Sequence, residues 1–436
     1  MRPPAPEPTD SPSLWRDRDF RSLWAGQTAS QFGAQAGQVT LPLLAVVALN
    51  ADATQLGALR AVQQVPILLL SLFVGVWVDR WRSSRDVMVR ADFGRAVALA
   101  AIPVAFLLGV LGMPVLLVLA FLIGVLTVFF DVAYQAALVR LVRRDQLAQG
   151  NSALEGSRSA AQIGGPALGG ALVSLLSAPI AVVAGAFFFT LSFLSIRRIR
   201  PQEAMGNHVA RPPAARPARM RKQILEGLRF VGGDPSLRAV ALASALFHFF
   251  FAALMTVYLL FLPRTLQLSG AEVGLVLAAM GPGALVGSVL SARLPRRLGY
   301  GVVLVSSAAL AEGVMLFVPA LHGSSGFTIA CLMVINFLFG VFTQLVDVTV
   351  MAARQSITPA AIQGRTVATL NFVGMGLTPL GSLLGGVLAA GWGPRTSLLL
   401  TVVGLFLSPV SMVFSPLARL GKELPAPRGT GGSPAM

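Results

Sequence analysis

The sequence predicts an all-α membrane protein with twelve transmembrane helices in two pseudo-symmetric six-helix bundles. Three observations predict this fold. The chain of 436 residues is 55% hydrophobic and 12% charged, with a mean hydropathy of +0.74, whereas soluble domains carry roughly a quarter charged residues. A segment at 121–132 recurs at 337–348 with seven identical positions. Finally, basic residues gather in alternate connections between long apolar runs.

The repeated segment indicates a duplicated chain, because its offset of 216 positions is close to half of the 436 residues. Both copies keep a glycine, a threonine and an aspartate at positions i, i+3 and i+7, which lie along one face of a helix. These residues are Gly124, Thr127 and Asp131 in the first copy, and Gly340, Thr343 and Asp347 in the second. We therefore expect the same narrow polar face in each half.

Windows of about 20 apolar residues give the individual spans. The first half contains spans near 23–49, 56–78, 87–111, 114–139, 153–176 and 178–196. The second half contains spans near 238–262, 270–292, 301–320, 327–352, 365–391 and 395–415. An even number of spans in each half leaves both halves in the same orientation, as a direct duplication requires.

The charges of the connections test this count independently. Connections on one side are rich in arginine, whereas those on the other side contain only two basic residues, Arg264 and Arg395. Positive connections face the cytoplasm. The alternation therefore predicts a multi-pass protein of the plasma membrane with both termini and the central connection in the cytoplasm. The net charge of +16 reports this orientation, and nucleic acid is not expected as a partner.

The expected domain organisation follows from the spans. It comprises a disordered cytoplasmic N-terminus (1–19), an N-terminal bundle (20–196), a basic cytoplasmic linker (197–237), a C-terminal bundle (238–415) and a disordered cytoplasmic tail (416–436). The linker sets Met220, Ile224, Leu228 and Val231 at helical spacing among basic residues, which is typical of an amphipathic helix on the inner leaflet. A simple tether and a regulatory lipid sensor both remain open for this segment.

The stretch that ends the second span carries a recognisable motif. Gly75, Asp79 and Arg80, followed by Arg85, resemble the signature loop Gly-x-x-x-Asp-Arg of the major facilitator superfamily. The resemblance implies a cytoplasmic gate made by Asp79, Arg80 and Arg85. The second half has a degraded counterpart in which Ser291 replaces the acid.

A second motif lies in the fifth span. Gly165, Pro166, Gly169 and Gly170 resemble the Gly-Pro-x-x-Gly-Gly core that marks antiporters of the superfamily. Physically, this stretch is a proline-containing helix with small residues for close packing. Residues 20–415 as a whole resemble the twelve-span drug:proton antiporter branch, which includes macrolide-efflux proteins and the enterobactin exporter. A departure is Ala34, where many relatives carry an acid.

The resemblance implies that spans one, four, seven and ten line a central cavity. Polar or aromatic candidates on the first, seventh and tenth spans are Gln27, Gln31, Gln35, Gln38, His248, Met255, Tyr258, Asn336 and Thr343. Buried amides in lipid require hydrogen-bond partners, so the glutamines face protein, water or substrate. Packing between helices is the alternative for each of these stripes.

The acids within the spans are few, and burial of an ionised carboxylate is costly. Asp92 with Arg95, and Glu155 with Arg158, have the i, i+3 spacing of local ion pairs. Asp131, Asp347 and Glu312 have no basic neighbour within one helical turn. These three are the candidates for proton coupling, with Asp131 and Asp347 favoured.

Enzyme signatures are absent from the sequence. One cysteine and three scattered histidines give no metal constellation, and no phosphate-binding Gly-x-x-x-x-Gly-Lys motif occurs. We therefore expect no cofactor, no metal and no enzymatic activity. The expected partners are a small-molecule substrate, protons and membrane lipid, with the protein acting as a monomer.

The function predicted from these features is secondary active transport. We expect proton-coupled efflux of a small amphipathic, drug-like compound by alternating access. Two alternatives remain open: export of a siderophore or antibiotic made by the host, and a transport-inactive membrane sensor or scaffold. The sequence identifies neither the substrate nor the carboxylate that carries the proton.

Overall fold

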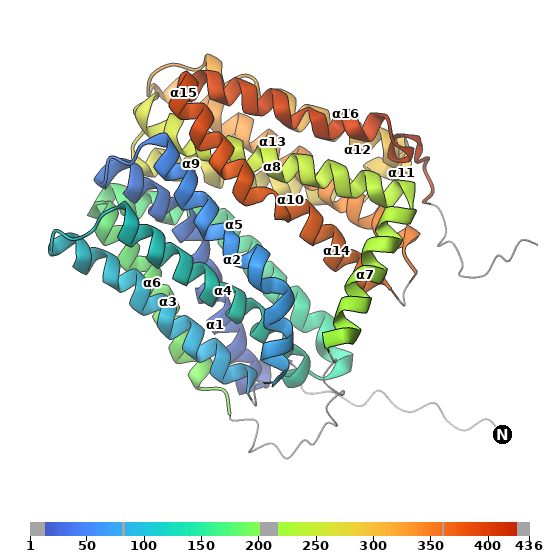
Figure 1. Cartoon of the computed structure of the whole chain (residues 1–436), viewed down its shortest axis with the longest axis horizontal. Helices are drawn as coiled ribbons and strands as arrows, with labels where there is room; N and C mark the ends of the chain where they lie inside the picture. Colours follow the sequence, from blue (N-terminus) through green and yellow to red (C-terminus); the bar gives the residue numbers. More distant parts are fainter. Residues whose placement is uncertain (1–13, 81–82, 201–216, 360–361, 425–436) are drawn as a thin grey trace, which may run out of the picture.

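The structure is a computed structural model that describes residues 14–80, 83–200, 217–359 and 362–424. Within these residues the regular elements are all helical. Figure 1 shows them as two bundles, one from each half of the chain. The predicted all-α fold with two six-helix bundles is therefore confirmed.

Six helices of the N-terminal half each make one pass. They are α1 (Arg18–Leu43), α2 (Ala53–Arg80), α3 (Ser84–Leu107), α4 (Met113–Leu141), α5 (Leu147–Leu176) and α6 (Ala178–Arg197). Local chemistry defines where they begin. Asp17 caps α1 by accepting hydrogen bonds from the N–H groups of Asp19 and Phe20 at 2.7 and 3.1 Å, and Ser83 caps α3 in the same way.

The passes of the C-terminal half are more often interrupted. They are made by α8 (Pro235–Arg264), α9 with α10 (Gly270–Ala278, Met280–Ser291), α12 (Tyr300–Met315), α13 (Gly326–Ile357), α14 (Gln363–Gly376), α15 (Thr378–Leu405) and α16 (Leu407–Val413). A short helix, α11 (Leu294–Leu298), connects α10 to α12. The last two predicted spans meet at Gly393 of α15, where the backbone leaves helical geometry and turns sharply. The φ angle of 75° there suits glycine.

Length and apolar composition support the membrane assignment. Among the described residues, eight helical segments are long and apolar enough to cross a membrane. One of these, Arg365–Val413, turns at Gly393 and makes two passes. Helices α1, α2 and α3 complete the twelve passes of the two bundles.

The molecule has two ends that differ in charge. We call the end that carries the start of α1 at Arg18, the end of α6 at Arg197 and the final turn near Leu420 the basic end. The opposite end carries the turns at Asn50 and Gly393. In Figure 1 the two bundles approach each other near α9 and the start of α2, which belong to the opposite end.

Small residues form the contacts between the two halves. Helix α2 packs against α15, and α5 packs against α9. A Cβ atom on Gly57 would come within 3.0 Å of the Cα of Gly386, and a Cβ on Gly274 would come within 2.8 Å of the Cα of Gly170. Glycines let helix backbones approach closely in a membrane, where dispersion rather than the hydrophobic effect holds helices together.

A helix in the predicted linker docks on the C-terminal half. Helix α7 (Pro217–Gly233) packs against α14 and lies across the basic end in Figure 1. Glu226 forms an ion pair with Arg365, and Val231 is buried against the bundle. Leu228 is exposed, and the side chains of 217–224 lie outside the described residues.

Residues at both edges of the described part of the chain pack against the bundles. In the N-terminal segment Leu14 is buried. In the C-terminal tail Leu417 is buried, and the carbonyls of Leu420 and Gly421 accept hydrogen bonds from the start of α12 at 3.0 and 2.9 Å. These contacts order the residues next to the spans. Residues 1–13 and 425–436 lie outside the described part of the chain.

Candidate functional site

The repeated segment occupies equivalent places in the two bundles. Gly124 on α4 packs against α2, where an added Cβ would lie 2.9 Å from the ring of Pro66. Gly340 on α13 packs in the same way against the backbone of Met280, the first residue of α10. Each glycine therefore allows close approach between the helix of the repeat and the second pass of its own half.

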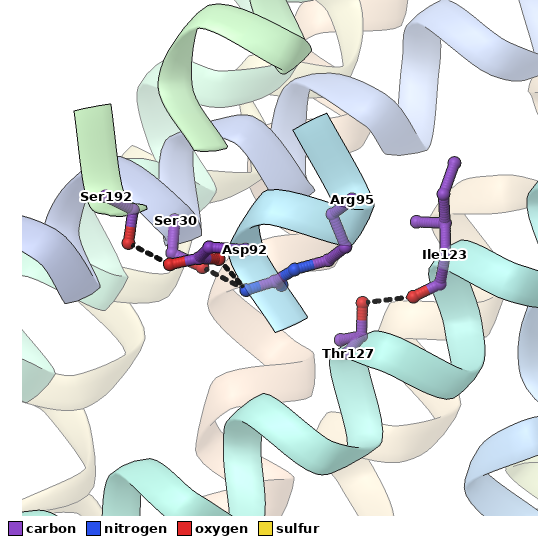
Figure 2. Close-up of polar contacts among 6 residues, drawn as sticks. All are labelled: Ser30, Asp92, Arg95, Ile123, Thr127 and Ser192. Carbon is purple, nitrogen blue, oxygen red and sulfur yellow. Dashed lines mark hydrogen bonds and ion pairs between the residues drawn. The ribbon is translucent and has the colours of Figure 1, made fainter. Parts of the chain in front are cut away.

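The two threonines of the repeat bond to their own helices. The Thr127 hydroxyl donates to the carbonyl of Ile123 at 2.8 Å, and the Thr343 hydroxyl donates to the carbonyl of Phe339 at 2.7 Å. Figure 2 shows the first of these bonds. Back-bonding of this kind satisfies a hydroxyl within the membrane without a partner from another helix.

The two aspartates of the repeat are accessible from outside the protein. Asp131 and Asp347 are both exposed, although each lies within a helix that crosses the membrane. Asp131 follows Gly124 by seven positions, so it shares the face of α4 that packs on α2. His248 and Arg354 lie within electrostatic range of Asp347. The repeat thus places one accessible acid on α4 and one on α13, the equivalent helices of the two halves.

A polar hollow of about 590 Å³ lies between α4 and α5. Its lining comprises Tyr134, Asn151, Ser152, Glu155, Gly156 and Ser159. Tyr134 is three positions from Asp131, and the charges of Asp131, Glu155 and Arg158 all reach it. Hydroxyl, amide and carboxylate groups therefore gather on one open face of the N-terminal half. No sequence pattern predicts this hollow, because Asn151, Ser152 and Ser159 belong to no motif that indicates a site.

A buried charge cluster lies behind this face. Arg95 donates a hydrogen bond to Asp92, and it also donates to the Ser30 hydroxyl at 3.1 Å. The Ser192 hydroxyl donates to the second carboxylate oxygen of Asp92 at 2.5 Å. Figure 2 shows how these groups converge. The cluster ties α3 to α1 and α6.

Two aromatic rings enclose the guanidinium of Arg95. It lies 4.3 Å from the ring centroid of Phe130 and 4.2 Å from that of Phe189. Cation–π attraction of this kind strengthens when the cation is removed from water. Phe130 precedes Asp131 on α4, so the buried cluster also fixes the helix that carries the accessible acid.

The other acids differ sharply in their surroundings. Glu155 and Arg158 form an exposed ion pair of 2.7 Å on α5. Glu312 on α12 is 1% exposed, and its Oε2 atom has no hydrogen-bond partner among the described residues. A buried carboxyl group without a partner is tolerated far better as the neutral acid than as the anion.

The glutamines of α1 do not share one environment. Gln27 is buried, whereas Gln31 is half-buried. Gln35 packs against Gly165 of α5, and Gln38 is exposed and accepts a hydrogen bond from Arg60 at 3.3 Å. Residues four apart are slightly more than one helical turn apart, so the stripe of glutamines winds around α1. Its two ends therefore meet different neighbours.

The candidates of the C-terminal half bridge α8 and α13. Asn336 donates a hydrogen bond to the Tyr258 hydroxyl at 2.7 Å. Earlier on α8, Phe251 stacks between Phe247 and Phe339, and the distances between ring centroids are 5.3 and 5.7 Å. Met255 lies between Phe251 and Tyr258 in the sequence, and its side chain is also buried. The described contacts between α8 and α13 are therefore mainly apolar and aromatic, in contrast to the polar hollow of the other half.

His248 is next to the aromatic stack. Its Nδ1 atom lies 2.8 Å from the carbonyl oxygen of Ser244, and its ring meets Phe247 edge-on. The hydrogen bond to the helix backbone fixes the orientation of the ring.

The glycines of the fifth span contact two different partners. Gly169 packs against Ala36 of α1, where a Cβ would come within 2.8 Å of the Ala36 carbonyl oxygen. Gly170 packs against Gly274 of the other half, and the carbonyl of Pro166 would lie 2.6 Å from a Cβ on Gly274. This motif therefore lies where the halves meet.

The signature loop is only partly visible. The side chains of Gly75, Asp79 and Arg80 lie outside the described residues. Arg85 donates to the carbonyl of Arg197 at 2.7 Å and forms an ion pair with Asp86 at 3.1 Å. Both of these partners belong to the N-terminal half. In the described residues no group of histidine, cysteine or acidic side chains could hold a metal ion.

Comparison with known proteins identifies the family. The sequence model described as transmembrane secretion effector matches residues 11–429. The chain belongs to this family, within the major facilitator superfamily. The multidrug efflux pump Tap of Mycobacterium tuberculosis is 28% identical over 368 residues, which cover 80% of this chain and 82% of Tap. The MFS-type transporter y4rN of Sinorhizobium fredii is 26% identical over 373 residues, covering 84% and 87% of the two chains.

Solved structures agree with the fold of this chain. A bacterial homologue of the human lysosomal transporter Spinster superimposes with a TM-score of 0.73 at 13% identity, covering 94% of this chain and 98% of the homologue. A bacterial homologue of the iron transporter ferroportin gives 0.70 at 16% identity, covering 91% and 98%. The protein is a multi-pass secondary transporter of small molecules, not an enzyme.

Proposed function

We propose that the protein exports a small amphipathic or cationic compound in exchange for protons, by alternating access of its two halves. The observation that carries this proposal is the exposed Asp131, which lies three positions before Tyr134 in the lining of the polar hollow. An accessible acid within a membrane helix is a functional group by default. The similarity to the efflux pump Tap supports the direction of transport.

The chemistry of the two walls supports the substrate class. The hollow of the N-terminal half offers Glu155, Tyr134 and hydroxyl groups to a polar or cationic moiety. The C-terminal half offers the aromatic stack around Phe251 to an apolar moiety. Aromatic rings with a few polar groups are typical of small-molecule sites. We therefore assign an amphipathic substrate with its polar part towards α4 and α5.

We assign the basic end to the cytoplasm, because positive connections remain on that side of the membrane. The glycine contacts of Gly57 with Gly386 and of Gly170 with Gly274 lie towards the opposite end. Under this assignment, the described state is closed towards the outside. We propose that Asp79, Arg80 and Arg85 form a cytoplasmic gate; among the described contacts, Arg85 bonds within its own half in this state.

We infer that Asp131 and Asp347 are the proton carriers. Both are accessible, and the duplication places them at matching positions in the two halves. A carrier must exchange its proton with water or substrate, so accessibility favours these two acids over the buried Glu312.

The test is proton movement in proteoliposomes that contain the purified protein. Lipophilic cations, macrolides and siderophores would be added in turn, with wild type compared with Asp131→Asn and Asp347→Asn. We expect substrate-driven proton flux in wild type and its loss in at least one variant. Asp145→Asn is the control, because Asp145 pairs only with the exposed Arg143 among the described residues. Binding of these compounds without proton flux in any protein would contradict antiport.

A further inference from the structure

Two arginines lie at the opposite end of the molecule, where the orientation of the chain does not call for basic residues. Arg264 and Arg395 are the basic residues of connections that otherwise lack Lys and Arg. The distribution of charge that orients the chain disfavours basic residues on this side. A local role is therefore expected for each of them, and the contacts of the two differ.

Arg264 joins the two halves. It ends α8 of the C-terminal half, and its Nη2 atom donates a hydrogen bond of 2.6 Å to the carbonyl of Ala51 in the N-terminal half. Ala51 is fully buried, and its own N–H donates to the carbonyl of Ala45 at 2.8 Å. The acceptor is therefore held in place by the end of the first pass.

A carboxylate next to the acceptor adds to this contact. Asp52 follows Ala51, and the charge of Arg264 reaches its carboxylate. Asp52 is itself fixed, because it accepts hydrogen bonds from the Thr54 hydroxyl and the Gln55 N–H at 2.5 and 2.8 Å. A guanidinium thus meets a carbonyl and a nearby anion at the start of α2. Hydrogen bonds from charged donors are roughly twice as strong as those between neutral groups.

The neighbouring contacts between the halves are neutral. Gly57 with Gly386, and Gly170 with Gly274, meet by van der Waals contact. The N–H of Ala271 donates to the Ser174 hydroxyl at 2.6 Å. Contacts of this kind let the halves separate with little loss of specific bonding, whereas the Arg264 contact must be broken when the opposite end opens.

We propose that Arg264 is the latch of the gate at the opposite end. Its hydrogen bond to Ala51 stabilises the state in which that end is closed, and its release permits the outward-open state. This inference rests on the alternating access proposed above. Arg264 is a positioning residue in this scheme, because it acts through the relative placement of the halves and does not contact the substrate.

Arg395 provides a matched control. It lies at the same end of the molecule and carries the same charge. Its guanidinium donates to the carbonyl of Leu321 at 2.9 Å and contacts His322, and it lies 5.9 Å from the ring centroid of Phe261. All of these partners belong to its own half. Loss of this arginine removes a comparable surface contact without affecting the boundary between the halves.

The experiment measures the separation of the halves directly. Spin labels at Leu108→Cys and Phe327→Cys, which are 71% and 76% exposed at the opposite end, would report distances by pulsed electron resonance in a Cys331→Ser background. Arg264→Gln is expected to raise the ratio of the longer-distance to the shorter-distance population about threefold to tenfold. Arg264→Lys should restore part of the shift, and Arg395→Gln should leave the parent distribution unchanged.

The outcomes separate the latch from other effects. An unchanged distribution in Arg264→Gln, or an equal shift in Arg395→Gln, would overturn the proposal. Thermal unfolding of each variant shows whether it is folded, and a shift confined to folded Arg264→Gln supports the latch. Because the labels require no substrate, a latch demonstrated in a protein without proton flux would refute proton antiport and retain the conformational role of Arg264.

Discussion

Arg95 donates a hydrogen bond to Asp92 one turn earlier on α3, and both side chains are almost completely buried. The pair is not isolated, because Ser30 and Ser192 supply further hydrogen bonds from two other helices. Breaking a buried ion pair by removing one partner leaves an uncompensated charge. The cluster should therefore be a main determinant of the stability of the N-terminal half.

We predict that Asp92→Asn lowers the free energy of unfolding by about 3–5 kcal/mol. The amide keeps the shape of the side chain but leaves the charge of Arg95 without its anion. Unfolding of the purified protein by heat or denaturant in detergent provides the measurement.

Glu155→Gln is the control for this prediction. Glu155 and Arg158 have the same i, i+3 spacing but are exposed, so the expected loss is below about 1 kcal/mol. Similar losses in the two variants would show that burial does not set the strength of these pairs.

The sequence predicted the Asp92–Arg95 pair, but it could not predict the environment of the pair. Helical spacing places the two residues together, and this is local information. Ser30 and Ser192 lie 65 and 100 positions from their partners, and no periodicity links them to α3. The sandwich of Arg95 between Phe130 and Phe189 likewise depends on how three helices pack.

The fold and the rest of the site show the same contrast between local features, which the sequence predicts, and contacts between distant segments, which it does not predict. Hydropathy and the repeat predicted twelve passes in two halves, because these signals lie within single spans. The small residues of α5 predicted close packing, but their partner Gly274 lies in the other half, more than 100 positions away in the sequence. The spacing predicts one polar stripe on α1, but it carries no information on which helices pack there. Gln35 meets α5, and Gln38 meets α2.

Gly274 gives a second prediction. An alanine there would bring its Cβ within 2.6 Å of the Pro166 carbonyl and 2.8 Å of the Gly170 Cα. Backbone atoms cannot move aside cheaply, so α5 and α9 must separate. We expect Gly274→Ala to destabilise the closed state by about 1–3 kcal/mol, seen as a larger long-distance population between labels at the opposite end.

Gly313→Ala on α12 is the matched substitution for this prediction. A Cβ there would meet no described atom within 4 Å. Alanine is also the better helix former by roughly 0.5–1 kcal/mol, so this variant should be as stable as wild type or more stable. An equal opening in both variants would argue against the glycine contact as the cause.

The docking of α7 gives a third prediction. A Cβ on Gly227 would come within 2.5 Å of the Thr369 hydroxyl and 3.1 Å of the Arg365 carbonyl. Gly227→Ala should therefore loosen α7 from α14. We expect trypsin cleavage at the exposed Arg229 to become about tenfold faster, which corresponds to roughly 1.4 kcal/mol within the usual range for overpacking.

Gly232 on the same helix tests the specificity of this effect. A Cβ on Gly232 would meet no described atom within 4 Å, so Gly232→Ala should leave cleavage at Arg229 unchanged. Acceleration in both variants would mean that cleavage follows the helix propensity of α7 and does not report its docking.

The final prediction concerns pH at the opposite end. The Thr54 hydroxyl and the Gln55 N–H donate to Asp52 and hold the pKa of its carboxyl below the usual value for aspartate. A carboxylate with a lowered pKa stabilises the folded state above its ordinary pKa of about 3.9. That stabilisation is lost as the pH falls through the folded-state value. The start of α2 should therefore loosen below about pH 3.9.

Hydrogen exchange at the amides of Leu56 and Gly57 measures this loosening. Loss of an N-cap costs about 1 kcal/mol, so protection should fall roughly fivefold as Asp52 becomes protonated. Asp52→Asn retains a capping oxygen without a titrating charge, so its protection should not follow the same step. Asp52→Ala should lack the protection at every pH. A step in protection that persists in Asp52→Asn would assign the titration to another group.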